Sequence, residues 1–265
     1  MNTAEKCEIV IPARLASTRL PGKILLAETG KPLIQHVWEG ACQSKKASGI
    51  TIATDDEKIL RTVEAFGGRA VMTSRLCACG TDRIAEVARE MPDVDIFVNV
   101  QGDEPEILGD AIDTVASLLL ENPQAVMATL ATPIREKAKL DDPACVKVVF
   151  DRNGRALYFS RSVIPYPRGG WDDAYLSVQP PMFYQHLGIY AYRRDFLLKI
   201  STLPQTVLEK TESLEQLRVL ENGYDIRVGV VPYAGIGIDT PEDYREFVAK
   251  WQATHMENRN SGEAR

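Results

Sequence analysis

No apolar run in this chain reaches the roughly 18 residues that a membrane-spanning helix needs. The N-terminal stretch from Met1 to Glu8 is polar and lacks the apolar core of a secretory signal. Cysteine is scarce, and the five residues are scattered and odd in number, which does not indicate a disulfide framework. These absences lead us to expect a cytoplasmic protein without a membrane partner.

An excess of basic residues is also missing. The chain has 31 Lys and Arg residues against 37 Asp and Glu residues, which gives a net charge of −6. Broad nucleic-acid binding needs a basic surface, so we expect no nucleic-acid partner. Any chemistry on phosphate must then depend on a local cluster of cations. Zinc is not expected, because no second Cys/His pair stands near Cys77 and Cys79.

Apolar residues make up 45% of the chain, enough for a large core. In the first half, apolar runs of strand type alternate four times with amphipathic stretches of helix type. We expect strands at 8–12, 49–53, 70–73 and 94–100 and helices at 33–42, 59–66, 82–90 and 111–120. This alternation indicates a parallel sheet with helices on both faces. Ligands bind such sheets at the carboxyl ends of the strands, so the expected working loops follow Ile11, Ala53 and Val100.

The second half of the chain is less regular. The Asn153-Gly154 pair predicts a tight hairpin between strands at 146–150 and 155–160, and a proline- and glycine-rich stretch spans 165–181. We expect a strand at 187–192, a helix at 207–220, strand-like runs at 224–231 and 235–238, and a closing helix at 242–251. The prediction is one domain over residues 1–252 with an insertion at about 150–185, followed by a disordered tail at 253–265.

The first candidate site is the loop from Pro12 to Lys23, which follows the first strand. It contains three cations, Arg14, Arg19 and Lys23, and two hydroxyl side chains. Arginine can clamp phosphate oxygens bidentately, and loop N–H groups add further donors. The glycine spacing of a Walker A loop or a dinucleotide-binding turn is missing. A solvated basic loop is the alternative, but the position after the first strand of a parallel sheet favours a triphosphate site.

Two aspartates form the second candidate site. Asp103 and Asp239 each follow an apolar strand and a glycine, and each precedes a proline. The alternatives are a local turn cap at Asp103 and a helix N-cap region at Asp239. Strands that end at one sheet edge would bring the two carboxylates together, and a divalent cation would remove their repulsion. We therefore predict a Mg²⁺ site at Asp103 and Asp239.

Six motifs occur along the chain in the order of one enzyme family. They are IPARLASTRLPGK (11–23), CGTDR (79–83), VQGDEP (100–105), HLGIYAYR (186–193), LEQLR (214–218) and GIDTPEDY (237–244). With these motifs the chain resembles the 3-deoxy-manno-octulosonate (Kdo) cytidylyltransferases. The loop and the aspartates are shared more loosely with sialic acid cytidylyltransferases.

The resemblance implies a fold and a reaction. The fold would be a three-layer α/β nucleotidyltransferase (Rossmann-like) fold with a mostly parallel central sheet and an inserted region for dimerisation and sugar binding. The enzyme would transfer CMP from CTP to Kdo, releasing pyrophosphate and forming CMP-Kdo for lipopolysaccharide biosynthesis. Mg²⁺ would be its cofactor, CTP and Kdo its substrates, and a homodimer its assembly.

The resemblance also implies roles for individual residues. The phosphates of CTP would be held by Arg14, Ser17, Arg19 and Lys23, with Thr81 and Arg83 near the nucleotide. Kdo would be held by Gln101, His186 and Glu215, together with Arg161. The catalytic set would be Asp103, Asp239, Arg19 and Lys23, with the two aspartates as metal ligands.

Some features leave alternatives open. The family usually has His and Ser where Cys77 and Cys79 stand, in the loop expected near cytosine. By residue type alone, His186 is more typical of a structural histidine and Glu215 of a solvated helix residue. Two other functions stay open: transfer to a different acidic sugar, such as sialic acid or an 8-amino Kdo, and a module that binds CTP without turnover.

Overall fold

The N-terminal half folds as the alternation of the sequence predicts. Its elements are β1 (Cys7–Ala13), α1 (Leu33–Ala41), β2 (Gly49–Thr54), α2 (Glu57–Ala65), β3 (Ala70–Met72), α3 (Gly80–Arg89), β4 (Ile96–Asn99) and α4 (Gly109–Leu120). A short 3₁₀ helix, η1 (Lys23–Leu25), follows the basic loop. The structure is a computed structural model that describes residues 5–17, 19–77, 79–169, 173–232, 235 and 237–262.

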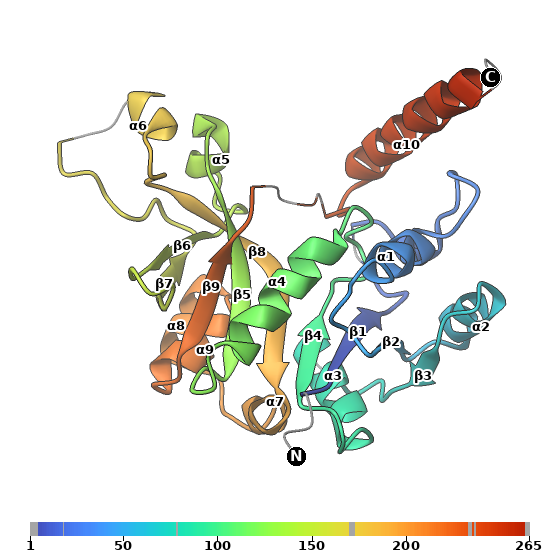
Figure 1. The fold of residues 1–265 in the computed structure, drawn as a ribbon, viewed down its shortest axis with the longest axis horizontal. Coiled ribbons are helices and arrows are strands. Elements are labelled where there is room, and N and C mark those ends of the chain that lie inside the picture. The colour runs from blue at the N-terminus through green and yellow to red at the C-terminus, as the bar shows by residue number, and fades with distance from the viewer. Residues whose placement is uncertain are drawn as a thin grey trace.

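The main sheet has the strand order β3-β2-β1-β4-β8-β5-β9 (Figure 1). The strands β1 to β4 pair in parallel, which confirms the predicted parallel half. The strand β8 (Tyr184–Arg193) runs antiparallel between β4 and β5 (Met127–Pro133), and β9 (Ile226–Val230) pairs in parallel with β5. The sheet is thus mostly parallel with one reversed strand near its centre.

Helices cover both faces of this sheet, because the strand side chains alternate between two apolar cores. Ile9 and Val98 point into a core shared with α1, α2 and α4, whereas Val10 and Phe97 point into a core shared with α3. The helices α7 (Arg194–Ile200) and α9 (Gln216–Glu221) add to the second core. The architecture is therefore three-layered, as predicted, with the ends of β1 and β4 at one edge.

The hairpin of β6 (Lys147–Phe150) and β7 (Ala156–Ser160) joins the same sheet, because β6 also pairs with β8 (Figure 1). The hairpin is confirmed, with Gly154 at φ 75° in its turn. The helices α5 (Lys137–Asp141) and α6 (Asp173–Ser177) form a small lobe that projects beyond it. A separate apolar cluster stabilises it, with Ile134, Leu140, Leu176 and Phe183.

Several second-half predictions were wrong or incomplete. The expected helix at 207–220 is two helices, α8 (Val207–Glu212) and α9, because Ser213 adopts the left-handed conformation at φ 52°. The run at 235–238 forms no strand at Gly235, Gly237 and Ile238, and Ile236 lies outside the described residues. The strand β5, which lies between β8 and β9, was missed, because Ala, Thr and Pro dilute its apolar run.

The closing helix α10 (Pro241–Gly262) is longer than predicted. Its backbone continues through the segment 253–262 that we expected to be disordered, because the sequence there contains no helix-breaking residue before Gly262. Phe247 and Trp251 of α10 contact the ring of His36 edge-on, which fastens the helix to α1. Among the described residues, no helix has the length and apolarity to cross a membrane.

A pair of leucine substitutions tests the position of the core. Leu119 of α4 is fully buried, whereas Leu76 is 92% exposed. We expect Leu119→Ala to lower the free energy of unfolding by about 2–5 kcal/mol, because it leaves a cavity in the core. The control Leu76→Ala should change it by about 0.5 kcal/mol or less. Urea titration measures both, and similar losses in the two variants would contradict this packing.

Candidate active site

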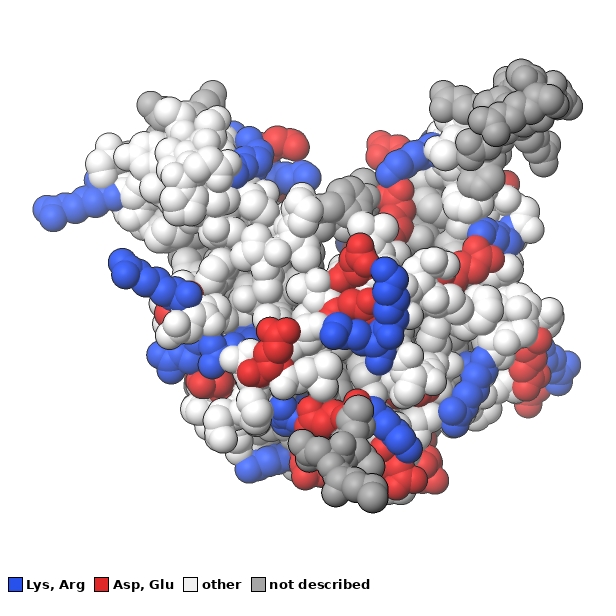
Figure 2. All heavy atoms as spheres, in the orientation of Figure 1, with Lys and Arg blue, Asp and Glu red and all other residues white. Residues whose placement is uncertain are grey.

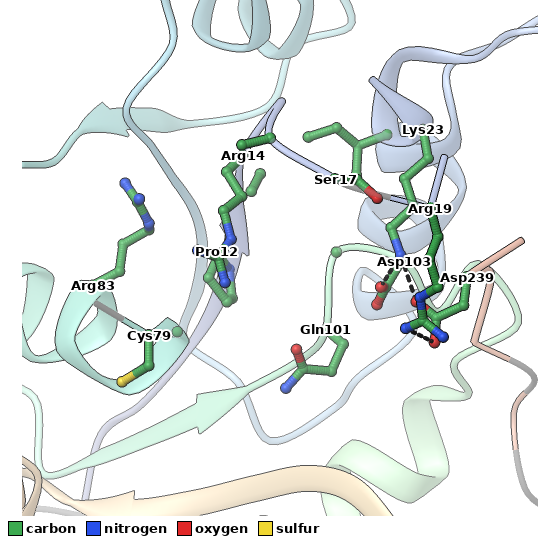
Figure 3. Close-up of a pocket in the computed structure, with 15 residues that line it drawn as sticks. Pro12, Arg14, Ser17, Arg19, Lys23, Cys79, Arg83, Gln101, Asp103 and Asp239 are labelled. Carbon is green, nitrogen blue, oxygen red and sulfur yellow. Dashed lines mark hydrogen bonds and ion pairs between the residues drawn. The ribbon is translucent and has the colours of Figure 1, made fainter. Parts of the chain in front are cut away.

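A cleft of about 620 Å³ lies at the carboxyl ends of β1 and β4. Its lining comes from the basic loop, the start of α3, the turn after β4 and the approach to α10: Pro12, Ala13, Arg14, Ala16, Ser17, Arg19, Lys23, Ile24, Cys79, Gly80, Arg83, Gln101, Gly102, Asp103 and Asp239. In Figure 3 Cys79 and Arg83 lie at one end, and Lys23, Arg19 and the two aspartates at the other. Eight of the residues predicted from the sequence line the cleft: Arg14, Ser17, Arg19, Lys23, Arg83, Gln101, Asp103 and Asp239.

The molecule is hollowed on the face that Figure 2 shows, between the lobe with α5 and α6 and the helix α10. Cations and carboxylates are interspersed on this face, and neither sign forms a broad patch there. Any binding of phosphate must therefore depend on the cations inside the cleft, as the net charge of −6 also indicates.

Backbone geometry places Lys23 at the centre of one cleft wall. Gly22 adopts φ 68°, a conformation that costs little only for glycine, and its N–H donates to the Leu15 carbonyl at 3.2 Å. The chain therefore folds back over the basic loop and enters η1 at Lys23. This turn buries the Lys23 side chain to 11% exposure.

The Lys23 ammonium binds both predicted metal ligands. Its Nζ atom lies 2.5 Å from Asp103 Oδ2, 3.0 Å from Asp239 Oδ1 and 2.6 Å from the Ile238 carbonyl (Figure 3). Desolvation acts to lower the pKa of Lys23, but the hydrogen bonds and charges of Asp103 and Asp239 outweigh it and raise the pKa overall. Arg19 adds an ion pair to Asp239 at 2.9 Å. The two carboxylates thus converge, as predicted, but the cation between them in this structure is Lys23.

Two backbone features hold the aspartates in this arrangement. Gly102 lies so close to β1 that a Cβ atom there would be 2.8 Å from the Pro12 carbonyl oxygen. The Ile238 N–H donates to the Asp103 carbonyl at 2.8 Å, which joins the turn after β4 to the segment before α10. Together these contacts bring three distant segments of the chain to one point.

The alternative role of Asp239 as a helix cap is not what the structure shows. The backbone N–H groups of Asp239 and Thr240 donate to Asp243, at 3.0 and 2.7 Å, and the Asp243 N–H donates to the Thr240 hydroxyl. Thr240 and Asp243 therefore cap α10, with Pro241 at its first position. The carboxylate of Asp239 is left to face Lys23 and Arg19.

The donor set suits Mg²⁺. Two carboxylates converge within reach of one cation, and magnesium is usually bound by one or two carboxylates together with substrate phosphates and water. Within the described ranges, no cluster of three or more His, Cys, Asp or Glu side chains forms a metal site made of protein ligands alone. The arrangement therefore fits a metal ion shared with a phosphate substrate.

The opposite end of the cleft is held by Arg83. Its guanidinium pairs with Asp55 at 2.8 Å and also donates to the Thr73 hydroxyl. The loop after Ala53 was expected to line the site. It instead supplies Asp55, the ion-pair partner of the buried Arg83. Gly80 at the N-terminus of α3 lines the cleft in its place, where backbone N–H groups favour an anion.

Thr81 and Glu215, predicted for different substrates, contact each other. The Thr81 hydroxyl donates to Glu215 Oε1, and the Cys79 thiol is also hydrogen-bonded to Glu215. Thr81 is buried and does not line the cleft, whereas Cys79 does. Glu215 is therefore linked to the cleft through α3.

His186 lines a second cavity of about 170 Å³, together with Glu104 and Gly188. Burial lowers the pKa of His186 to about 3, so its imidazole is neutral near pH 7. Its Nε2 atom lies 2.9 Å from the Thr129 hydroxyl, which also contacts the carbonyls of Leu187 and Ile189. Because the Thr129 hydroxyl donates its proton to a carbonyl, it must accept a hydrogen bond from His186, which places the ring proton on Nε2. The other ring nitrogen of the neutral His186, Nδ1, is then an acceptor.

Glu104 was passed over in the sequence, although it is the second carboxylate of the turn after β4. Desolvation raises its pKa to about 8, and the negative charge of Asp103 adds to this effect. Gly188 separates the Glu104 cavity from the cleft residue Gln101, whose Nε2 donates to the Gly188 carbonyl at 3.2 Å. The QGDEP motif was the signal that could have identified Glu104.

Arg161 lines neither cavity. Its guanidinium donates to the backbone carbonyls of Pro143, Glu212 and Ser213. These contacts hold the left-handed turn between α8 and α9, directly before Glu215. In this structure Arg161 therefore supports the segment that carries Glu215.

Residues 9–226 match the family described as Cytidylyltransferase. The chain is 50% identical over 245 residues to the 3-deoxy-manno-octulosonate cytidylyltransferase of Rhodopirellula baltica. The alignment covers 92% of this chain and 98% of the relative. It is 49% identical over 249 residues to the enzyme of the same name from Geotalea uraniireducens, covering 92% and 98%.

Solved structures agree in fold. A CMP:2-keto-3-deoxy-manno-octonic acid synthetase complexed with CTP matches with a TM-score of 0.87 and 43% identity, covering 94% of this chain and 100% of the other. A cytidylyltransferase from Leptospira borgpetersenii matches with a TM-score of 0.59 and 18% identity, covering 97% and 96%. The second likeness supports the fold alone.

The neutral His186 makes a prediction about acid stability. Its pKa is about 3 in the folded protein and 6.5 when unperturbed, so below pH 6.5 only the unfolded chain takes up this proton. Stability is therefore lost as the pH falls from 6.5 towards 3. Between pH 7 and pH 5 we expect this site to cost about 2 kcal/mol. Urea titrations at both pH values should show His186→Gln losing less stability than the parent, and equal losses would contradict the assignment.

Proposed function

The chain belongs to the 3-deoxy-manno-octulosonate cytidylyltransferase family, and we infer that it transfers CMP from CTP to Kdo, forming CMP-Kdo for lipopolysaccharide biosynthesis and releasing pyrophosphate. One observation carries the inference at the level of the site. Lys23 holds Asp103 and Asp239 together in a cleft that the basic loop and Gln101 also line. Such a cleft supplies cations for a triphosphate and carboxylates for a metal ion.

The nucleotide is proposed to bind along the basic loop. Arg14, Ser17, Arg19 and Lys23 all line the cleft and would hold the phosphates. In this structure Arg19 and Lys23 pair with the aspartates instead. A triphosphate that enters the cleft offers these two cations new oxygen partners, which supports a change of partner on binding.

Asp103 and Asp239 are proposed to hold Mg²⁺. When bound there, the ion would neutralise charge on the phosphate oxygens. Lys23 and Arg19 add positive charge beside the reacting phosphate, in a site whose donors are already in place. During transfer, the anomeric oxygen of the sugar bonds to the α-phosphorus while the bond to pyrophosphate breaks, and the hydroxyl proton is released.

The sugar is proposed to bind between Gln101, His186 and Glu215. The Gln101 amide can donate to the sugar carboxylate, whereas the neutral His186 offers an acceptor at Nδ1 and suits a hydroxyl group. The carboxylate of Glu215 likewise accepts from hydroxyl groups. His186 offers the sugar no N–H donor, because its Nε2–H is already used by Thr129.

The predicted homodimer stays part of the proposal. Among its described residues, the region 150–185 exposes the large apolar side chains of Leu157, Tyr166 and Val178, which are 53%, 80% and 41% exposed. Exposed apolar side chains that form a patch are typical of a contact surface. They support contact with a second copy through this region.

An acceptor panel tests the proposed reaction. Purified protein is given CTP and Mg²⁺ with Kdo, an 8-amino Kdo, sialic acid or no sugar, and pyrophosphate release is measured. We expect turnover with Kdo and a CMP-Kdo product by mass spectrometry. Faster turnover with sialic acid or the 8-amino sugar would reassign the acceptor. Binding of CTP without turnover on any sugar would favour the sensing module.

Isosteric substitutions test the metal ligands. Asp103→Asn and Asp239→Asn keep the side-chain size and remove the charge, so we expect melting near the parent temperature and a loss of most turnover. The control Asp195→Asn alters a side chain that is 99% exposed and away from the cleft, and should keep full activity. Near-normal turnover of either cleft variant at low Mg²⁺ would show that this aspartate is not a ligand.

A further inference from the structure

The start of α3 reaches across to the start of α9 through two side chains. Thr81 donates its hydroxyl proton to Glu215 Oε1, over a sequence separation of 134 residues. Cys79, two residues earlier, is hydrogen-bonded to the same carboxylate. Thr81 is buried and Glu215 is half-buried, so their contact is partly shielded from water.

Both groups act as donors. Burial and the charge of Glu215 raise the pKa of the Cys79 thiol to about 12, so the sulfur keeps its proton. The Thr81 hydroxyl likewise donates, because a carboxylate oxygen can only accept.

The carboxylate is also held from the other side. Arg161 binds the carbonyls of Glu212 and Ser213, and the Tyr190 hydroxyl lies 3.4 Å from Gln216 Oε1. These contacts hold the residues on both sides of Glu215, and among the described residues Cys79 and Thr81 bind its carboxylate directly. Cys79 is the member of this group that lines the cleft.

We propose that Thr81 and Cys79 are positioning residues for the acceptor sugar, which orient the Glu215 carboxylate so that it accepts hydrogen bonds from the sugar hydroxyls. The resemblance implied a place for Thr81 near the nucleotide, whereas its hydroxyl is directed to Glu215. This inference rests on the proposed function of the cleft. It also means that α3 serves both substrates, with Gly80 and Arg83 on the nucleotide side and Thr81 on the sugar side.

The first test replaces the hydroxyl of Thr81 by a methyl group of the same size. A hydrogen bond to a charged group is lost in Thr81→Val, so we expect the KM for Kdo to rise about ten- to a hundredfold. We expect kcat and the calorimetric Kd for CTP without sugar to change by about twofold or less, because Thr81 does not line the cleft. Thr81→Ser retains the hydroxyl and should restore the KM for Kdo.

The second test shows whether Thr81 acts through Glu215. In a Glu215→Leu background, which has no acceptor for the Thr81 hydroxyl, Thr81→Val should add little to the KM for Kdo, because coupled residues are not additive. Cys79→Ala should raise the KM for Kdo by a smaller factor than Thr81→Val. The control Thr62→Val removes an exposed hydroxyl that only bonds within α2, and should leave both KM values unchanged.

Three outcomes would overturn the inference. One is weaker CTP binding of Thr81→Val in the absence of sugar, which would return Thr81 to the nucleotide. Another is a KM for Kdo that Thr81→Ser does not restore, or effects of Thr81→Val and Glu215→Leu that are fully additive. The third is an unchanged KM for Kdo in folded Thr81→Val. If the parent protein forms no CMP-Kdo at all, the proposed function fails instead, and the acceptor panel shows this independently.

Discussion

The cleft depends on one buried ammonium group. Lys23 binds oxygens of Asp103, Ile238 and Asp239, which are 80, 215 and 216 residues away in sequence. A buried ammonium without partners would be costly, and two neighbouring carboxylates without a cation would repel each other. Each group therefore requires the others, and their mutual satisfaction fixes the basic loop, the turn after β4 and the segment before α10 at one point. Ion pairs and hydrogen bonds thus stabilise the wall of the cleft, whereas apolar packing stabilises the sheet below it.

The reversed strand β8 adds the second half of the site to this arrangement. Parallel strands alone would end in loops around the nucleotide, but β8 runs back beside β4 and carries His186, Tyr190 and Tyr192. Its pairing with β5 shifts register after Thr129, and the displaced carbonyls of Leu187 and Ile189 are bound by the Thr129 hydroxyl. Such a bulge re-aims side chains locally, which accounts for the burial of His186 beside Phe159. The two halves meet where Gln101 bonds to Gly188 and where Thr81 bonds to Glu215.

Most residues that line the cleft could be predicted from the sequence, whereas His186 and Glu215 were reached only by resemblance. Strand–helix alternation is a local signal, so β1 to β4 and the place of Asp103 follow from it, but Asp239 reaches the cleft from a segment that forms no strand. The strand β5 lacks that signal, because its burial comes from its place between β8 and β9 and not from a run of branched apolar residues. The break at Ser213 depends on Arg161, which binds two carbonyls at the turn from a distant strand end. The contact between Thr81 and Glu215 likewise joins two helices whose distance no local pattern encodes.

The charges of the cleft also bear on how the substrates enter. Of the four cations that line the cleft, Lys23 and Arg19 are paired with Asp103 and Asp239 and Arg83 is paired with Asp55, which leaves the charge of Arg14 in excess. A triphosphate that draws Lys23 and Arg19 to its oxygens would leave two carboxylates together without a cation, which is unfavourable in a partly buried site. A divalent ion that arrives with the triphosphate removes this penalty, because it binds the carboxylates as the two cations leave them. On the proposed function, the pairing of Lys23 with both aspartates therefore favours entry of metal and nucleotide together over binding of either one alone.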